Sequence, residues 1–133
     1  MTDEKNNRWR QRFSNFESTY LFLKSGLENE NPSRLEQAGI IQAFEFTFEL
    51  AWKTLKDFLE AKNVIVAFPR DVIKEAFQAG LVENGERWLD MLDKRNLMSH
   101  AYNETNAAAA LALIRKNYFD AITQVFKTLK QMQ

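Results

Sequence analysis

Hydrophobic residues near the start of this chain recur at helical spacing, and this feature limits the chain to a largely helical fold. From about residue 5 to 28 they are separated by four, three, four, three and four positions. They are Trp9, Phe13, Phe16, Tyr20, Leu23 and Leu27. Because an α-helix has about 3.6 residues per turn, this spacing places all of them on one face. The sequence therefore predicts one long amphipathic helix that buries this face.

Local signals mark the start of a second helix. The polar segment 29–33 contains a proline and interrupts the first helix. Ser33 followed by Glu36 forms a capping-box pattern, which is typical of a helix N-terminus. The apolar stripe of this second helix consists of Ile41, Phe44, Phe48, Ala51, Leu55 and Phe58.

The rest of the chain predicts one short helix and two longer ones. Pro69 suits the first turn of a third helix, which runs to about Ala79 before a glycine ends it. A fourth helix is expected from Glu86 to about Ser99, and a last one after the polar stretch 103–106. The last helix carries Leu111, Ile114, Tyr118, Ile122, Val125 and Leu129. The predicted fold is all-α, an antiparallel up-and-down four-helix bundle with one additional short helix.

Length and charge restrict the domain organisation and the kinds of partner. With 133 residues, of which 45% are hydrophobic, the chain is expected to form a single domain over residues 1–133. Lys plus Arg and Asp plus Glu both number 18, so the net charge is zero. A neutral chain has no general attraction to nucleic acid, and contact with a nucleotide or RNA must therefore be local.

Cysteine and histidine usage excludes several classes of site. The chain has no cysteine and one histidine, His100, so disulfides, zinc clusters and sites that need two imidazoles are excluded. We expect no metal and no cofactor, and a reducing cytoplasmic setting is the simplest interpretation. The longest apolar run, residues 107–114, is too short to cross a bilayer, and the polar N-terminus does not resemble an export signal.

One face of the second helix is apolar where a simple bundle would leave it in water. Phe46 and Leu50 fall on the side opposite the main stripe, which predicts a second buried face, most simply a subunit interface. Glu45 and Glu49 flank the stripe one turn apart, beside Trp52. Two interpretations of these acids stay open: solvated edge residues, or carboxylates that point into the interface.

The segment 93–102 concentrates polar groups near a predicted helix end. It contains a guanidinium at Arg95, an amide at Asn96, a hydroxyl at Ser99, the imidazole of His100 and a phenol at Tyr102. Arginine binds phosphate with a planar fork of donors, and histidine exchanges protons near neutral pH. Together these two side chains suit metal-free cleavage of a phosphodiester.

A structural interpretation of the same segment also stays open. His100 would then cap a helix C-terminus as a weak cation, and Arg95 would pair with Asp93 or Glu86. Arg95 and His100 are five positions apart, about 140° around an ideal helix, so they diverge unless the helix ends or distorts. A dimer axis beside them would bring two copies together.

Three stretches of the sequence resemble a known family. Arg-Asn-x-x-Ser-His-x-Tyr at residues 95–102 is similar to the Arg-x4-His-x-Tyr signature of HEPN domains, the higher eukaryote and prokaryote nucleotide-binding fold. Residues 39–53 and 69–77, continued by residues 80–102, resemble the nucleotidyltransferase substrate-binding protein family. The resemblance covers most of the chain and rests on long stretches in the right order. Ala101 and Asn103 depart from residues that are frequent in relatives.

The resemblance implies a homodimer and a separately encoded minimal nucleotidyltransferase as partner, often as a toxin and antitoxin pair. In active relatives the residues that match Arg95 and His100 serve a metal-independent endoribonuclease, and the residue that matches Asn96 assists them. The tyrosine that matches Tyr102 accepts a nucleotide from the partner enzyme, and Ser99 belongs with it to the candidate nucleotide-binding group.

Three functions therefore stay open at this point. The favoured one is a substrate-binding partner subunit, because the long matches belong to that family and the neutral chain gives little help in capturing RNA. The alternative is a ribonuclease toxin that uses Arg95 and His100 at a dimer interface. In the third, the signature is a dimer contact without activity.

Overall fold

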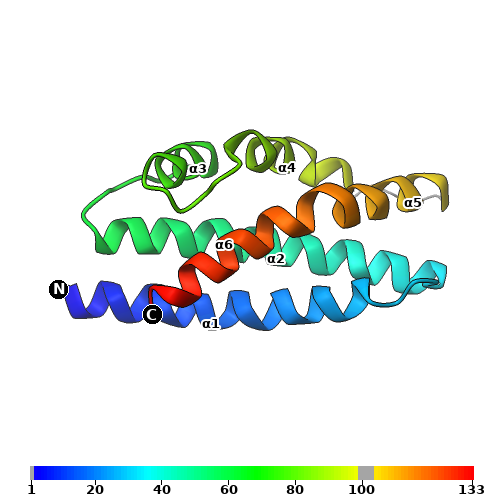
Figure 1. The fold of residues 1–133 in the computed structure, drawn as a ribbon, viewed down its shortest axis with the longest axis horizontal. Helices are drawn as coiled ribbons and strands as arrows, with labels where there is room; N and C mark the ends of the chain where they lie inside the picture. The colour runs from blue at the N-terminus through cyan, green and yellow to red at the C-terminus, as the bar shows by residue number, and fades with distance from the viewer. Residues whose placement is uncertain (1, 99–103) are drawn as a thin grey trace.

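The chain folds into a bundle of helices, and its last helix crosses the two long ones obliquely (Figure 1). The computed structural model describes residues 2–98 and 104–133, with side chains described for residues 3–95 and 105–133. In chain order the elements are α1 (Thr2–Leu27), α2 (Arg34–Ala61), α3 (Pro69–Gln78), α4 (Gly85–Met98), α5 (Glu104–Leu113), a π-helical turn (Ile114–Tyr118) and α6 (Phe119–Gln131). These described ranges contain no strand, and the predicted all-helical bundle with α3 as its additional short helix is confirmed.

The two long helices α1 and α2 form an antiparallel pair along the length of the molecule (Figure 1). The predicted capping box starts α2: the Ser33 hydroxyl accepts from the amide of Glu36 at 3.1 Å, and the Glu36 carboxylate accepts from the amide of Ser33 at 2.8 Å. A Cβ atom on Gly26 would lie 2.9 Å from Cγ1 of Ile40, so glycine permits the close approach of the two helices.

The predicted apolar stripes form the core. In α1 the stripe from Trp9 to Leu23 is buried and Leu27 is partly buried, and in α2 the whole stripe from Ile41 to Phe58 is buried. Phe126 of α6 adds a ring that stacks on Tyr20, with 4.3 Å between the ring centroids. Side-chain packing across these helices therefore supplies the hydrophobic stabilisation that the sequence pattern predicts.

The C-terminal part differs from the single regular helix that the sequence predicts. The predicted apolar positions are buried, but residues 114–118 form a π-helical turn in which the amide of Phe119 donates to the carbonyl of Ile114. The side chain of Arg115 extends from this turn and donates hydrogen bonds to the carbonyl oxygens of Leu27 and Asn29, at the C-terminal end of α1. The turn thereby satisfies carbonyls that have no helical partner.

Helices α3 and α4 cover the other side of α2 (Figure 1). Pro69 opens α3, and Gly80, with a φ of 80°, follows its end as predicted. The two helices bury Val72, Ile73, Trp88 and Met91. Within the described ranges, no helix has a hydrophobic stretch long enough to span a lipid bilayer.

Candidate functional site

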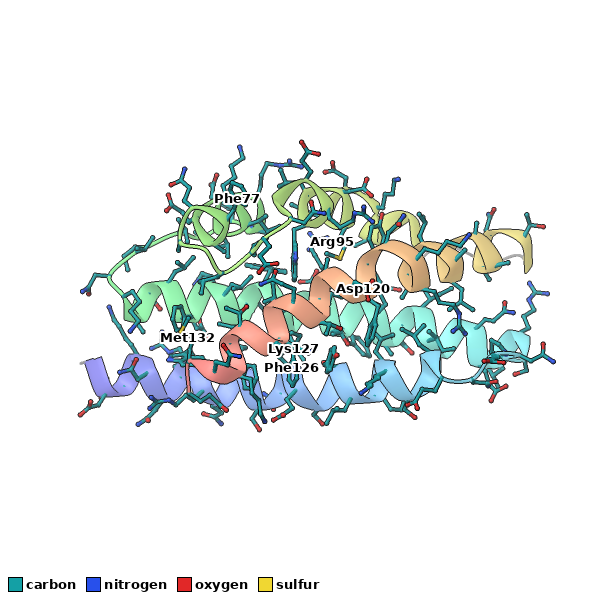
Figure 2. All side chains as sticks on the ribbon, viewed as in Figure 1. Phe77, Arg95, Asp120, Phe126, Lys127 and Met132 are labelled. Carbon is teal, nitrogen blue, oxygen red and sulfur yellow. The ribbon has the colours of Figure 1, made fainter. Side chains whose placement is uncertain are left out.

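Arg95 lies near the end of α4 on the side that faces α2 (Figure 2). Its guanidinium donates through Nη1 to Oε1 of Glu49 and lies over the ring of Phe48, 5.9 Å from the ring centroid. The side chain of Arg95 is 26% exposed and that of Glu49 is 36% exposed. The ion pair is thus half-buried, and it fixes the direction of a guanidinium that remains accessible from solvent.

The Glu49 carboxylate is held from two directions. Its second oxygen, Oε2, accepts a hydrogen bond from the indole nitrogen of Trp52 at 2.9 Å. Residues 49 and 52 are one helical turn apart on α2, so the helix itself brings this donor to the carboxylate. Trp52 is buried, which makes the arrangement a rigid support for Arg95.

The ion-pair partners that the sequence suggested for Arg95 were wrong. Arg95 does not pair with Asp93 or Glu86: Asp93 accepts from Arg70 of α3 at 2.6 Å, and Arg95 pairs with Glu49, 46 residues earlier. Glu49 therefore pairs within its own chain, and its place at a subunit interface stays a prediction.

The other predicted interface residues of α2 have different surroundings. Phe46 is 55% exposed, as its position opposite the apolar stripe predicts. Leu50 is partly buried and packs against the core, so this part of the predicted second buried face is covered within the chain itself. Glu45 is half-buried.

The remaining predicted site residues fall at the edge of the described structure. Asn96 belongs to α4, but its side chain is not among those described. Ser99, His100 and Tyr102 lie outside the described residues, so their geometry relative to Arg95 stays a prediction. Among the described residues, no three Asp, Glu or His side chains gather in a way that could hold a metal ion.

A second polar contact joins α4 to the π-helical turn. The hydroxyl of Tyr118, a residue that the sequence placed only in the core, donates to Oδ2 of Asp90 at 2.6 Å. This hydrogen bond, supported by Lys94 at 3.4 Å, holds the pKa of the Asp90 carboxyl below its ordinary value of 3.8. Burial and the same bond raise the pKa of the Tyr118 hydroxyl. Because a buried tyrosine hydroxyl needs a hydrogen-bond partner, the predicted burial of Tyr118 could have indicated a contact of this kind.

We expect the substitution Tyr118→Phe to destabilise the fold by about 1 kcal/mol near neutral pH. The lowered pKa of Asp90 stabilises the folded state above pH 3.8 and loses this effect as pH falls below it. The raised pKa of Tyr118 stabilises the folded state below pH 10 and loses this effect as pH rises above it. Urea unfolding of the wild type and of Tyr118→Phe should therefore show a difference in unfolding free energy that becomes smaller at both low and high pH.

Tyr20→Phe is the matched control for this prediction. Tyr20 is also buried, but its hydroxyl bonds to the hydroxyl of Thr123 at 2.9 Å, which does not titrate. The stability difference of this control should stay constant in the acid range. A stability difference between wild type and Tyr118→Phe that also stays constant at acidic pH would contradict a hydrogen bond from Tyr118 to a charged Asp90.

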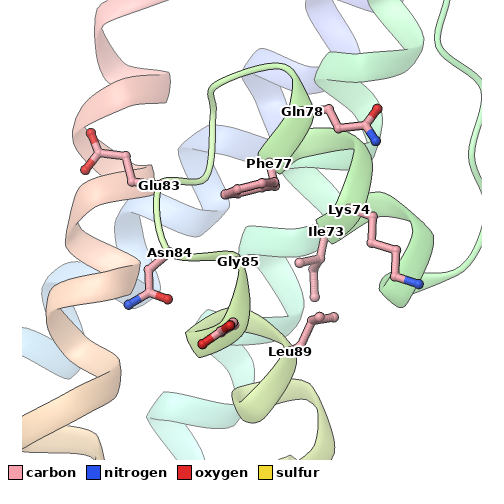
Figure 3. Close-up of a pocket in the computed structure, with 9 residues that line it drawn as sticks. Ile73, Lys74, Phe77, Gln78, Glu83, Asn84, Gly85 and Leu89 are labelled. Carbon is pink, nitrogen blue, oxygen red and sulfur yellow. The ribbon is translucent and has the colours of Figure 1, made fainter.

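A cavity lies between α3 and α4, and it was not predicted from the sequence (Figure 3). Its volume is about 720 Å³, and Ile73, Phe77 and Leu89 supply its apolar lining. Gly85 opens α4 at its edge. Phe77 follows Ile73 by four positions on α3, so helical spacing could have suggested their common face.

Comparison with known proteins assigns the family. The family model described as nucleotidyltransferase substrate binding protein like matches residues 11–131. This chain belongs to that family. The match confirms the resemblance seen in the sequence, and it runs from α1 to α6, so it includes both Glu49 and Arg95.

Relatives of this family member agree with the assignment. Among curated proteins it is similar to the probable ribonuclease HepT of Haemophilus influenzae, with 34% identity over 82 residues that cover 58% of this chain and 56% of that protein. The chain thus spans about half the length of that curated relative.

Two solved structures share the fold. A protein from Thermus thermophilus is 36% identical, with a TM-score of 0.78 and coverage of 86% of this chain and 98% of that one. HI0074 of Haemophilus influenzae is 27% identical, with a TM-score of 0.64 and coverage of 94% of this chain and 98% of that one. The structure of HI0074 is described as revealing the fold of a substrate binding domain of a nucleotidyltransferase.

Proposed function

We propose that this protein is the substrate-binding subunit of a two-component system with a separately encoded minimal nucleotidyltransferase. The family match over residues 11–131 carries the proposal, and the description of HI0074 supports it. Tyr102 is the candidate acceptor of the nucleotide, and Ser99 stands with it in the candidate binding group. We further propose that the two proteins form a pair of the toxin-antitoxin type and that they act in the cytoplasm.

The contacts of Arg95 support a role in binding a phosphate group. Only one guanidinium nitrogen, Nη1, hydrogen-bonds within the described part of the chain. An arginine side chain has five N–H donors, so the others can bind an anionic oxygen. Glu49 and Trp52 hold the group in place before any ligand arrives, which lowers the entropic cost of binding. Arg95 precedes Tyr102 by seven positions, so the acceptor and this cation come from one short segment.

The exposed face of α2 supports a homodimer as the working unit. Leu35 is 84% exposed and Phe46 is 55% exposed, and both lie on one side of the helix with Gly39 and Gln42 between them. Exposed apolar residues in such a row favour burial against another protein surface. Glu45, half-buried at the edge of this row, belongs to the same proposed interface.

Co-purification with the nucleotidyltransferase encoded beside the gene tests the main proposal. The tagged protein should retain this enzyme, and incubation of the pair with nucleoside triphosphates should add the mass of a nucleotide to the peptide that holds Tyr102. The variant Tyr102→Phe should bind the enzyme equally well and gain no mass. Absence of a complex, or an equal mass gain in the variant, would refute the proposal.

A ribonuclease activity is the second candidate, favoured by the name of the Haemophilus influenzae relative, probable ribonuclease HepT. In this function Arg95 binds the scissile phosphate, His100 transfers the proton, and Asn96 assists, without a metal ion. Expression without the nucleotidyltransferase should arrest growth, and His100→Ala should relieve the arrest. Equal growth of the two strains would count against this activity.

A further inference from the structure

The cavity between α3 and α4 contains an aromatic ring that packs against a glycine and yet faces solvent. A Cβ atom on Gly85 would lie 3.1 Å from Cδ1 and 3.3 Å from Cγ of Phe77, so the ring lies directly on the glycine backbone. Phe77 is nevertheless 52% exposed. Figure 3 shows Ile73 and Leu89 beside it on the two helices. A ring that is already positioned loses little conformational entropy when a partner covers it.

The charges around this cavity favour a cationic occupant. Glu83 and Glu86 line it, are exposed, and make no ion pair with any other residue that the structure describes. Within the described lining, Lys74 is the one cation. The excess of carboxylate disfavours a phosphate or an RNA backbone here, whereas a Lys or Arg side chain would gain from it. The apolar area calls for an aliphatic or aromatic anchor next to that cation.

The position of the cavity connects it to the Arg95 site. Leu89 in its wall and Arg95 are six residues apart on α4, which is about 9 Å along a helix axis. Between them the Arg70–Asp93 ion pair joins α3 to α4 at 2.6 Å. A protein that binds in the cavity would therefore contact the same helix that carries Arg95, which precedes the proposed acceptor Tyr102 in the sequence.

We propose that this cavity is the docking site for the nucleotidyltransferase, which inserts an apolar side chain against Phe77 and places a flanking Lys or Arg near Glu83 and Glu86. The inference rests on the proposed function and adds the surface through which the two proteins meet. Aromatic residues in such pockets supply much of the binding energy of protein interfaces.

Titration calorimetry of the full chain with the neighbouring nucleotidyltransferase tests the docking site. Phe77→Ala should raise the dissociation constant about tenfold or more, since truncated anchor residues commonly have effects of this size. The double variant Glu83→Lys and Glu86→Lys should also weaken binding, and the loss should decrease as salt is added. Neither variant removes a fully buried side chain, so both should fold.

Matched controls separate the outcomes. Phe22→Ala removes another exposed ring, from α1, and the double variant Glu28→Lys and Glu30→Lys reverses two exposed acids that follow the end of α1. Both controls should bind like wild type. Wild-type binding retained by Phe77→Ala would overturn the docking site and leave the proposed function intact. No binding by the wild type would overturn both the docking site and the proposed function. If Phe77→Ala instead loses only the homodimer, as seen by sedimentation, the cavity is a contact between two copies of this chain.

Discussion

In the ribonuclease function proposed as the second candidate, replacing Arg95 by alanine is expected to lower the rate of metal-independent RNA cleavage about 100-fold to 1,000-fold, the usual cost of removing a donor that stabilises a developing oxyanion. The guanidinium is half-buried and oriented by Glu49, so solvent would replace it poorly. Arg95→Lys keeps the charge but loses the planar fork, and it should recover only part of the rate. Single-turnover cleavage of a labelled RNA with a chelator present measures these rates.

Arg70→Ala is the matched control for this experiment. Arg70 also pairs with an acid on α4, Asp93, but it lies outside the signature and is 48% exposed. Its removal should leave the rate near that of wild type. In this candidate function Glu49 positions the arginine through the ion pair, so Glu49→Gln should cause a smaller decrease than Arg95→Ala. Equal rates for Arg95→Ala and Arg70→Ala would contradict the assigned role of Arg95.

Replacing Phe44 by alanine is expected to lower the free energy of unfolding by about 3–5 kcal/mol, a large part of the stability of a small domain. Phe44 is fully buried in α2, and its ring stacks on Tyr118 of the π-helical turn with 5.7 Å between centroids. Truncation removes this contact and leaves a cavity between α2 and the C-terminal helices. Urea unfolding followed by circular dichroism measures the change.

Phe22→Ala makes the same chemical change at a site that is 70% exposed. We expect its effect to stay within about 1 kcal/mol, since little apolar surface leaves the core. Similar losses of unfolding free energy for Phe44→Ala and Phe22→Ala would contradict the burial of Phe44 on the core face of α2.

The helices could be predicted from the sequence because their signals are local. The Ser33–Glu36 capping box, the proline that opens α3 and the glycine that follows it act within one helical turn. Apolar periodicity likewise predicts which face is buried. The π-helical turn was not predicted, since the same residues are buried whether the segment is regular or carries one wider turn.

The candidate site was predicted in part, and the missing part depends on tertiary contacts. The signature identified Arg95, but its partner Glu49 lies 46 residues away on another helix, and no spacing rule connects the two. Leu50 is partly buried against the core, and the cavity at Phe77 arises where α3 and α4 meet. Sequence periodicity shows which face of a helix is apolar, but it does not show which neighbour covers that face.

The Glu49–Arg95 ion pair has a consequence for selectivity. Because the guanidinium already has a carboxylate counterion, a phosphate that binds Arg95 in the proposed function must share the guanidinium with Glu49 or exchange with that carboxylate. Such an exchange gives little net gain to a singly charged competitor such as chloride or acetate. A doubly charged terminal phosphate, or a chain of phosphodiesters that brings several charges at once, gains more, so the resident carboxylate would act as a filter against simple anions.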